Sequence, residues 1–255
     1  MSNAQLTTRD ARQKSVLDLI RSPAMLDQLR AALPKHVTPE RLVRIVLTEI
    51  RRVPKLAECK QQSLLGAIVQ AAQLGLEPGV LGQCWIIPFG NEAVFIPGYR
   101  GLVQLMWRSN LVRAVSARAV FEGDTFGYDF GEDRIAHAPG GETDPEKLTH
   151  AWAAIHTTAG GRIIDVMTRE EIERTRRRSR AGTSGPWVTD YAEMAKKTVL
   201  RRLAKLAPAS VELMTALRLD DEADTGAPQE FDLSPDMAVP AEATSEAGEE
   251  GGGDA

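Results

Sequence analysis

The sequence predicts an α+β fold: a mainly antiparallel sheet of hairpins packed with helices, a helical N-terminal part and a disordered acidic C-terminal tail. Apolar side chains recur at helical spacing before Gly75 and in short β-rich runs after it. From Asp220 onward the chain has twelve acidic residues and no lysine or arginine. Strands that follow one another in hairpins indicate an antiparallel sheet.

The N-terminal part reads as helical. Residues 16–33 are apolar at helical spacing, and we interpret residues 1–37 as a helical lead-in. In the next segment Thr38 is suited to cap a helix and Pro39 to occupy its first turn. A further helix is expected over residues 61–74, with Gly75 as its stop.

Two hairpins are predicted in the middle of the chain. Residues 83–88 and 93–97 are rich in strand-forming side chains and flank a Gly-Asn turn. The second hairpin joins strands over 150–157 and 162–167. Between the two hairpins we expect a helix and two or three strands, over residues 99–108 and 111–138 respectively.

The C-terminal part begins with a capping box. Thr168 and Glu171 have the spacing at which a side-chain oxygen and a carboxylate satisfy each other's backbone N–H groups, so a helix starts here and ends near Gly182. A last long helix is expected over 187–206. One domain would then cover residues 38–219, and a tail over 220–255 would be disordered because it buries too little apolar surface.

Several functional classes have no support in the sequence. No apolar run reaches the roughly 18 residues of a membrane span, and the first ten residues lack a secretory signal, so we expect a cytoplasmic protein without a membrane partner. Cys59 and Cys84 are too few for a disulfide framework. The histidines lack metal-ligand spacing, and no G-x-x-x-x-G-K-[ST] phosphate loop is present. We predict no catalytic residue, no enzyme activity and no resident metal or cofactor.

The net charge of −4 conceals an uneven distribution. Residues 1–219 contain 31 basic and 23 acidic residues, a net charge of +8, whereas the tail carries −12. Ten basic and two acidic residues lie between Arg174 and Lys205. On a helical wheel Lys197, Arg201 and neighbouring basic residues form one face without alternating acidic residues, which predicts a polyanionic partner. Lys196 lies on the apolar side and must reach water or a fixed anion.

Six motifs resemble the RecT family of phage and prophage recombinases. They are QSLLGA at 62–67, AAQLGLEPG at 71–79, PFGNE at 88–92, GYRGL at 98–102, GPW at 185–187 and MAKKTVLRRL at 194–203. The resemblance covers about residues 38–210. It implies ATP-independent annealing of complementary single-stranded DNA in homologous recombination by a ring or helical filament of identical subunits. It also implies a phage exonuclease and a host single-strand binding protein as partners.

Annealing of any sequence requires a protein that holds the sugar-phosphate backbone by charge and leaves the base edges open. We assign Arg100 and the basic side chains of the last helix to phosphates, and the arginines before it to a cationic arm. Phe89 tips a hairpin that could insert between bases, and Trp187 could stack on them. The complete predicted DNA-binding set is Phe89, Tyr99, Arg100, Arg176, Arg177, Arg178, Trp187, Lys196, Lys197, Arg201, Arg202 and Lys205. A divalent cation such as magnesium would act only by screening phosphates.

Alternatives remain at this point. Asp165 and the glutamates at 170, 171 and 173 could belong to a metal-dependent nuclease, although the glutamates suit the first turn of a helix. A regulatory DNA-binding protein would prefer duplex or a defined sequence. Trp107 could stack with Arg100 or lie in the core, and the core is favoured for Trp107 as well as for Trp85 and Phe95. The tail either competes with DNA or only aids solubility.

Overall fold

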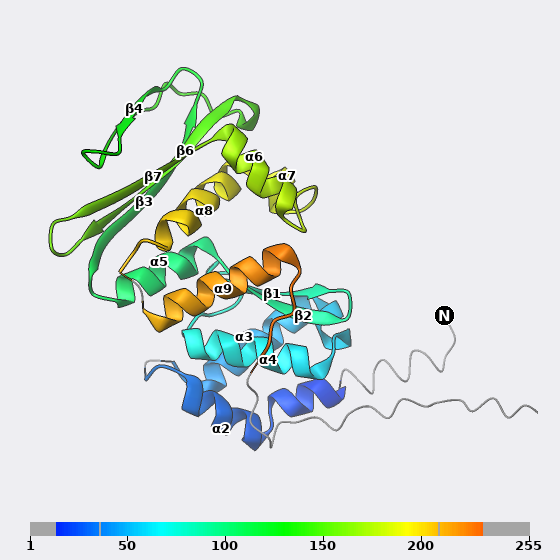
Figure 1. Ribbon diagram of the computed structural model, residues 1–255. Helices are drawn as coiled ribbons and strands as arrows, with labels where there is room; N and C mark the ends of the chain where they lie inside the picture. Colours follow the sequence, from blue (N-terminus) through cyan, green and yellow to red (C-terminus); the bar gives the residue numbers. More distant parts are fainter. Residues whose placement is uncertain (1–13, 36, 209, 232–255) are drawn as a thin grey trace, which may run out of the picture.

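Helices and small antiparallel sheets form two parts of the molecule, with helix α9 running between them (Figure 1). The computed structural model describes residues 14–35, 37–208 and 210–231. The expected α+β class is confirmed, and all strands within the sheets pair antiparallel. The predicted tail from residue 232 onward lies outside the described residues, as do residues 1–13 of the lead-in.

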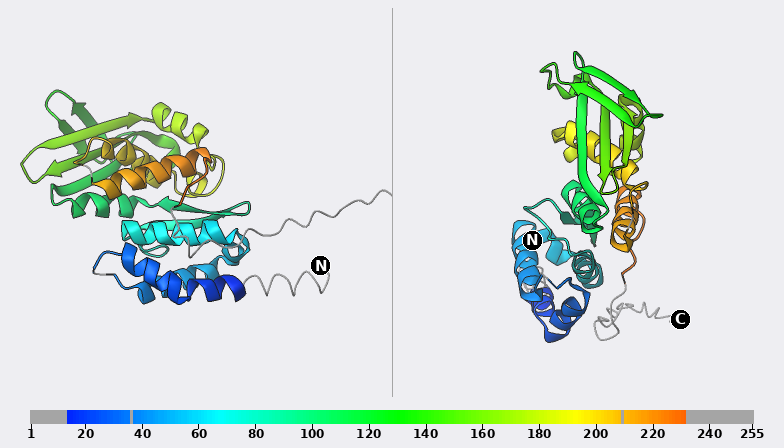
Figure 2. Two further views of the ribbon diagram at one scale, coloured as in Figure 1. Left: turned by 60° about the horizontal axis from the view of Figure 1, so that its bottom comes forward. Right: turned by 90° about the vertical axis from the view of Figure 1, so that its left-hand side faces the viewer.

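The N-terminal part is a helical layer. It contains α2 (Pro23–Ala32), α3 (Pro39–Arg52), the short helix η1 (Pro54–Glu58) and α4 (Gln61–Leu74). Thr38 caps α3 through its side chain, and Gly75 ends α4 in the left-handed conformation with φ 58°, as the sequence predicts. Helices α2, α3 and α4, drawn in blue and cyan, lie together in both views of Figure 2.

The first hairpin packs on this helical layer. Strands β1 (Cys84–Phe89) and β2 (Glu92–Pro97) pair antiparallel, and α5 (Tyr99–Arg108) follows. Phe95 and Ile86 face the core, so the core interpretation of Phe95 is confirmed. Trp85 is 39% exposed on the opposite face, which makes the same interpretation wrong for Trp85. Strand alternation puts Trp85 and Phe95 on opposite faces because Phe95 pairs with Ile86.

The C-terminal part is built on a three-stranded sheet of order β3-β6-β7. Its strands are β3 (Val112–Phe121), β6 (Leu148–Thr157), which follows the short helix η2 (Pro145–Lys147), and β7 (Arg162–Thr168). Helix α8 (Tyr191–Ala204) packs against this sheet, as does α6 (Arg169–Arg178) at its end. The predicted capping box of Thr168 and Glu171 is present.

The opposite face of this sheet meets a separate hairpin of β4 (Thr125–Asp129) and β5 (Arg134–Ala138). The Asp124 carboxylate accepts a hydrogen bond from His137 Nε2 at 2.9 Å, and Trp152 Nε1 donates to His137 Nδ1 at 3.0 Å. Asp124 also accepts from the backbone N–H groups of Gly140 and Phe121. These bonds lower the pKa of Asp124 to about 2, so the carboxylate joins hairpin and sheet as an anion.

Three predicted boundaries differ from the structure. The helix expected to end near Gly182 ends at Arg178, and the helix expected over 187–206 is divided at Asp190 into α7 (Pro186–Thr189) and α8. The predicted tail boundary at residue 220 is wrong. Helix α9 (Val211–Thr225) begins at a Ser210 cap and ends at Gly226, and its buried face includes Leu219 and Asp220. The acidic composition of this segment did not indicate a helix, because the cations that neutralise the carboxylates of α9 lie elsewhere in the chain.

Candidate nucleic-acid interface

The predicted basic face of α8 is neutralised by α9. Lys197 Nζ lies 2.8 Å from one oxygen of Asp220, and an Arg201 guanidinium nitrogen lies 3.0 Å from the other. Arg201 also pairs with Asp224. Asp220 is only 1% exposed, so this is an interior ion-pair cluster. The prediction that Lys197 and Arg201 are unpaired surface cations is therefore wrong.

The remaining basic side chains of α8 also have partners. The Arg202 guanidinium binds both oxygens of Asp165, at 2.6 and 2.7 Å, and one oxygen of Glu171 at 3.0 Å. Lys205 pairs with Asp221 at 3.2 Å. Lys196 pairs with Glu193, an exposed side chain one turn earlier on α8, so it reaches both an anion and the surface. The expected repulsion along this face is absent because carboxylates from β7, α6 and α9 reach it.

Trp187 belongs to the core. It is 3% exposed, and its ring centroid lies 6.1 Å from that of Tyr191. Its indole nitrogen has no hydrogen-bond partner among the described residues. The predicted role of Trp187 as a base-stacking ring is inconsistent with this burial. Sequence reasoning failed here because the ring joins the core through residues distant in the sequence, which the local pattern around Trp187 does not show.

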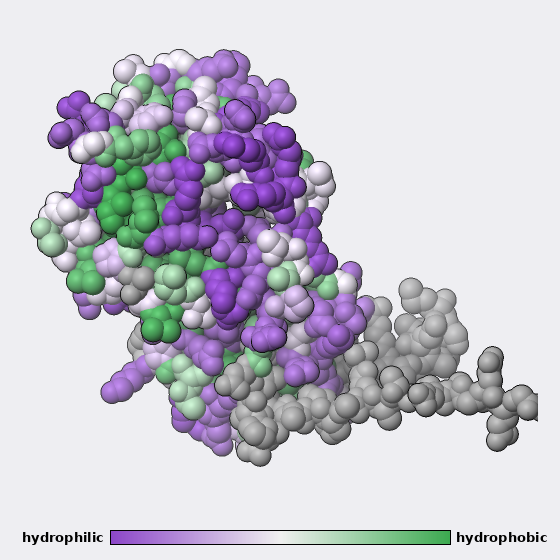
Figure 3. All heavy atoms as spheres, in the orientation of Figure 1, coloured by the Kyte–Doolittle hydropathy of each residue, from purple (hydrophilic) through white to green (hydrophobic). Residues whose placement is uncertain are grey.

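Within the basic stretch from Arg174 to Lys205, exposed cations without an ion-pair partner in the described part of the chain lie on α6. Arg174, Arg177 and Arg178 are exposed and make no ion pair with any carboxylate of the described residues. Their spacing of three and four residues places them on one side of the helix. Together with Arg202 they line a surface hollow beside Met167. Figure 3 shows strongly hydrophilic side chains in the region of α6.

Arg176 differs from its neighbours, although it was predicted in the same arm. Its guanidinium donates to the Gly182 carbonyl at 2.7 Å and lies 5.7 Å from the centre of the Tyr191 ring. It also forms a 3.4 Å ion pair with Glu173. Arg176 therefore holds the loop after α6, while Arg177 and Arg178 stay exposed. Arg174 belongs to the exposed group; it was predicted as part of the cationic arm but was missing from the predicted DNA-binding set.

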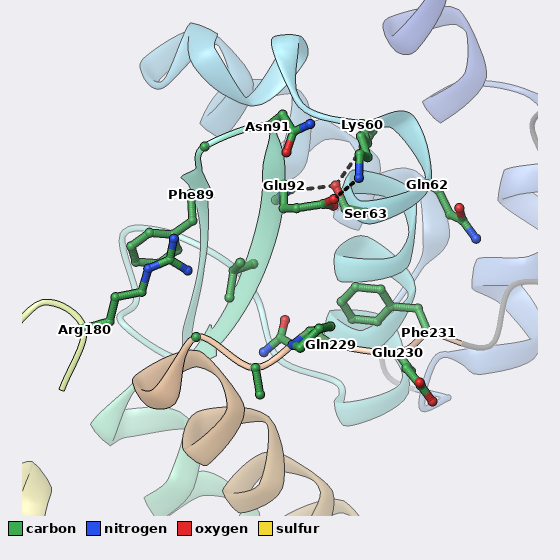
Figure 4. A pocket seen from close by; sticks show the side chains of 16 residues that line it. Lys60, Gln62, Ser63, Phe89, Asn91, Glu92, Arg180, Gln229, Glu230 and Phe231 are labelled. Atoms are coloured by element: carbon green, nitrogen blue, oxygen red, sulfur yellow. Dashed lines mark hydrogen bonds and ion pairs between the residues drawn. The ribbon is translucent and has the colours of Figure 1, made fainter. Parts of the chain in front are cut away.

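The β1–β2 hairpin reaches the end of this arginine surface. Arg180 lies over the ring of Phe89, 4.5 Å from its centre, at the hairpin turn (Figure 4). Trp85 and Ile87 are exposed on the outer face of β1. Arg180 thus covers the half-buried ring of Phe89, and one exposed aromatic ring, that of Trp85, lies four residues earlier on the same strand.

Helix α5 supplies the remaining predicted residues. Arg100 is exposed, and its guanidinium is 3.5 Å from the Leu81 carbonyl. Tyr99 is half-buried against the core, and this burial raises its pKa. Trp107 is 52% exposed, so the favoured core interpretation is wrong for this residue. Arg100 thus remains available for a phosphate, whereas Tyr99 packs mainly inside.

The carboxylates weighed for a nuclease have other contacts. Asp165 and Glu171 hold Arg202, and Glu171 also accepts the Thr168 backbone N–H. Across residues 14–35, 37–208 and 210–231, no group of three or more His, Cys, Asp or Glu side chains could hold a metal ion. In the same ranges no helix has the length and apolar character of a membrane span.

An α+β fold with an exposed arginine surface beside an apolar hairpin is of the kind that binds nucleic acids through phosphate charge. The model of the RecT family matches residues 40–235, and the chain belongs to the RecT family. It is 45% identical over 221 residues to Protein RecT of Escherichia coli (strain K12), covering 83% of this chain and 82% of that protein.

A second relative is more distant. The chain is 27% identical over 211 residues to the uncharacterized protein YqaK of Bacillus subtilis (strain 168), covering 80% of this chain and 71% of that protein. The resemblance seen in the sequence motifs is confirmed by the family match. Membership supports single-stranded DNA annealing in recombination as the function of this chain.

Proposed function

We propose that this chain anneals complementary single strands as an oligomer, without ATP and without catalysing a chemical step, and that the α6 arginines hold the DNA. The exposed group Arg174, Arg177 and Arg178 carries the proposal because it has no ion-pair partner among the described residues. Unpaired arginines can exchange bound counterions for phosphates without first breaking an internal ion pair. Arg100 extends the phosphate-binding surface.

The hairpin would contact the bases. Trp85 and Ile87 present apolar side chains outward, and Phe89 lies beneath Arg180 at the turn. Aromatic and aliphatic side chains can stack on any base, which suits annealing without sequence preference. Phosphates held by arginine would leave the base-pairing edges open to the second strand.

The finer aspects of the proposal rest on family membership. They include a ring or helical filament, a phage exonuclease and a host single-strand binding protein as partners, and a cytoplasmic location. A head-to-tail contact would keep successive subunits in register along a strand. Magnesium would help only by screening phosphates. End-labelled strands incubated with the protein and magnesium should therefore stay intact, and shortened strands would contradict a non-catalytic role.

The arginine surface is tested by changing Arg174, Arg177 and Arg178 together to alanine. At about 0.7 counterions per phosphate contact on a single strand, the log–log salt slope of binding should fall by about two units. The matched control changes Arg30, Arg52 and Arg218, which are exposed arginines that pair with carboxylates. The control has the same loss of charge and should keep its slope. Equal slopes for both triple variants would refute the assignment.

A further inference from the structure

The segment after α9 attaches to the edge of the β1–β2 hairpin. Gln229 Oε1 accepts the Phe95 backbone N–H at 2.9 Å, and Gln229 Nε2 donates to the Phe95 carbonyl at 2.8 Å. One carboxamide thus replaces the neighbouring strand that β2 lacks on this side. The same Nε2 also donates to the Leu219 carbonyl of α9 at 3.0 Å. Gln229 therefore joins β2 to α9.

A second contact fixes this segment on α4. Phe231 lies over Gly66, where a Cβ atom would overlap the aromatic ring. Gly66 thus provides the space that the ring occupies. Figure 4 shows Gln229 and Phe231 along one stretch of chain beside α4 and the hairpin. Gly226, with φ 77°, ends α9 and lets the chain turn toward β2.

The C-terminal end of α9 also holds the arginine surface. The Arg180 backbone N–H donates to the Asp224 carbonyl at 2.9 Å, and Ser179 Oγ donates to the Asp224 carboxylate at 3.2 Å. Arg180 in turn lies over Phe89. The contacts form a closed circuit from α9 through Arg180 and the hairpin back to α9 through Gln229. Residues 219–231 therefore connect the proposed phosphate-binding and base-contacting surfaces.

We propose that Gln229 is a positioning residue for annealing: it holds the β1–β2 hairpin at a set orientation to the α6 arginines. This inference rests on the proposed function. Gln229 itself would touch no DNA. Its loss would leave the phosphate contacts intact but allow the hairpin to depart from α9, so that bases on a bound strand are no longer presented in register.

The test is Gln229→Met, which keeps the length of the side chain and removes all three hydrogen bonds. Glu230→Ala is the matched control, because Glu230 is exposed and adjacent. Hydrogen bonds of ordinary net strength predict that the detached hairpin becomes at least about tenfold more populated. Exchange of the Phe95 amide hydrogen should accelerate by that factor. Annealing at saturating protein should slow, while the salt slope of single-strand binding stays at its wild-type value.

The outcomes separate this inference from the proposed function. Wild-type protein that fails to anneal overturns the proposed function. If the wild-type protein anneals and Gln229→Met anneals at the same rate, the positioning role is overturned. It is also overturned if Gln229→Met shows both slower annealing and a smaller salt slope of single-strand binding. If Gln229→Met does not fold, Gly66→Ala replaces it, because the added methyl group displaces Phe231 without touching the hairpin bonds directly. Slower annealing with an unchanged salt slope is expected there too, and wild-type annealing would refute the inference.

Discussion

Replacing Asp220 by asparagine should destabilise the protein strongly, although the change preserves shape. Asp220 is 1% exposed and receives both Lys197 and Arg201. In the variant Arg201 keeps Asp224, but Lys197 loses the carboxylate with which it pairs. Removing one partner of a buried ion pair leaves an uncompensated charge and costs about 3–5 kcal/mol. The free energy of unfolding should fall by that amount.

Urea unfolding followed by circular dichroism measures the effect. With a slope near the upper end of the usual range, about 3 kcal/mol per molar, the midpoint should fall by roughly 1–2 M. Asp221→Asn is the matched control, since the Asp221 side chain is 47% exposed, pairs with the exposed Lys205 and reaches Arg201 only at 4.0 Å. Such surface pairs contribute about 0–1 kcal/mol. Equal midpoints for the two variants would refute the assignment of Asp220 to a buried ion-pair cluster.

Acid provides an independent check of the same site. Burial opposes ionisation of Asp220, but Lys197 and Arg201 outweigh it and hold its pKa below the ordinary value of 3.8. A depressed pKa in the folded state contributes stability that is present above about pH 4 and lost as the pH falls further. The difference between wild type and Asp220→Asn should therefore narrow below pH 4. A difference that is constant down to pH 2 would contradict the ion-pair explanation.

Three further outcomes are expected. Removal of residues 232–255, which carry seven acidic residues, should leave the urea midpoint unchanged. If that segment competes with DNA, its removal should also strengthen single-strand binding at low salt. Removal of residues 220–255, which includes part of α9, should prevent stable folding. Trp187→Ala should cost about 3–5 kcal/mol of stability, measured by urea unfolding, because it empties a core site. Asp124→Asn should lower the free energy of unfolding measured with urea at neutral pH, because the Asp124 carboxylate accepts hydrogen bonds from the Gly140 and Phe121 backbone and from His137. Since the pKa of Asp124 is lowered to about 2, this contribution should be present above about pH 4 and lost as the pH falls toward 2.

Local signals predicted the secondary structure well. The Thr168 capping box, the stop at Gly75 and the turn after Phe89 depend on residues within a few positions of one another. The same reasoning misjudged α8, because Lys197 finds its carboxylate 23 residues later and Arg202 finds Asp165 37 residues earlier. A helical wheel shows only the residues of one helix, so it cannot show ion-pair partners that lie on other elements.

The prediction that the tail begins at residue 220 was wrong for a related physical reason. Composition alone treats Asp220 and Asp224 as solvated charges, but both neutralise cations of α8, and Leu219 beside them is buried. A useful signal was present: Ser210 and Gly226 bracket apolar side chains at helical spacing. The arginines predicted to form a cationic arm lie mostly on helix α6, and Arg176 differs from the others because it holds the loop that follows.

The outer edge of β2 has a consequence for the proposed assembly of many copies on one strand of DNA. The Ala93 N–H donates to Ser63 Oγ at 2.9 Å, the Phe95 N–H donates to Gln229, and Pro97 has no N–H. A strand edge whose backbone N–H donors are already hydrogen-bonded cannot pair with a strand from another molecule. Many copies aligned on one DNA strand would otherwise place such edges at high local concentration. In the oligomer proposed above, the side chains that occupy this edge would prevent strand pairing between neighbouring copies.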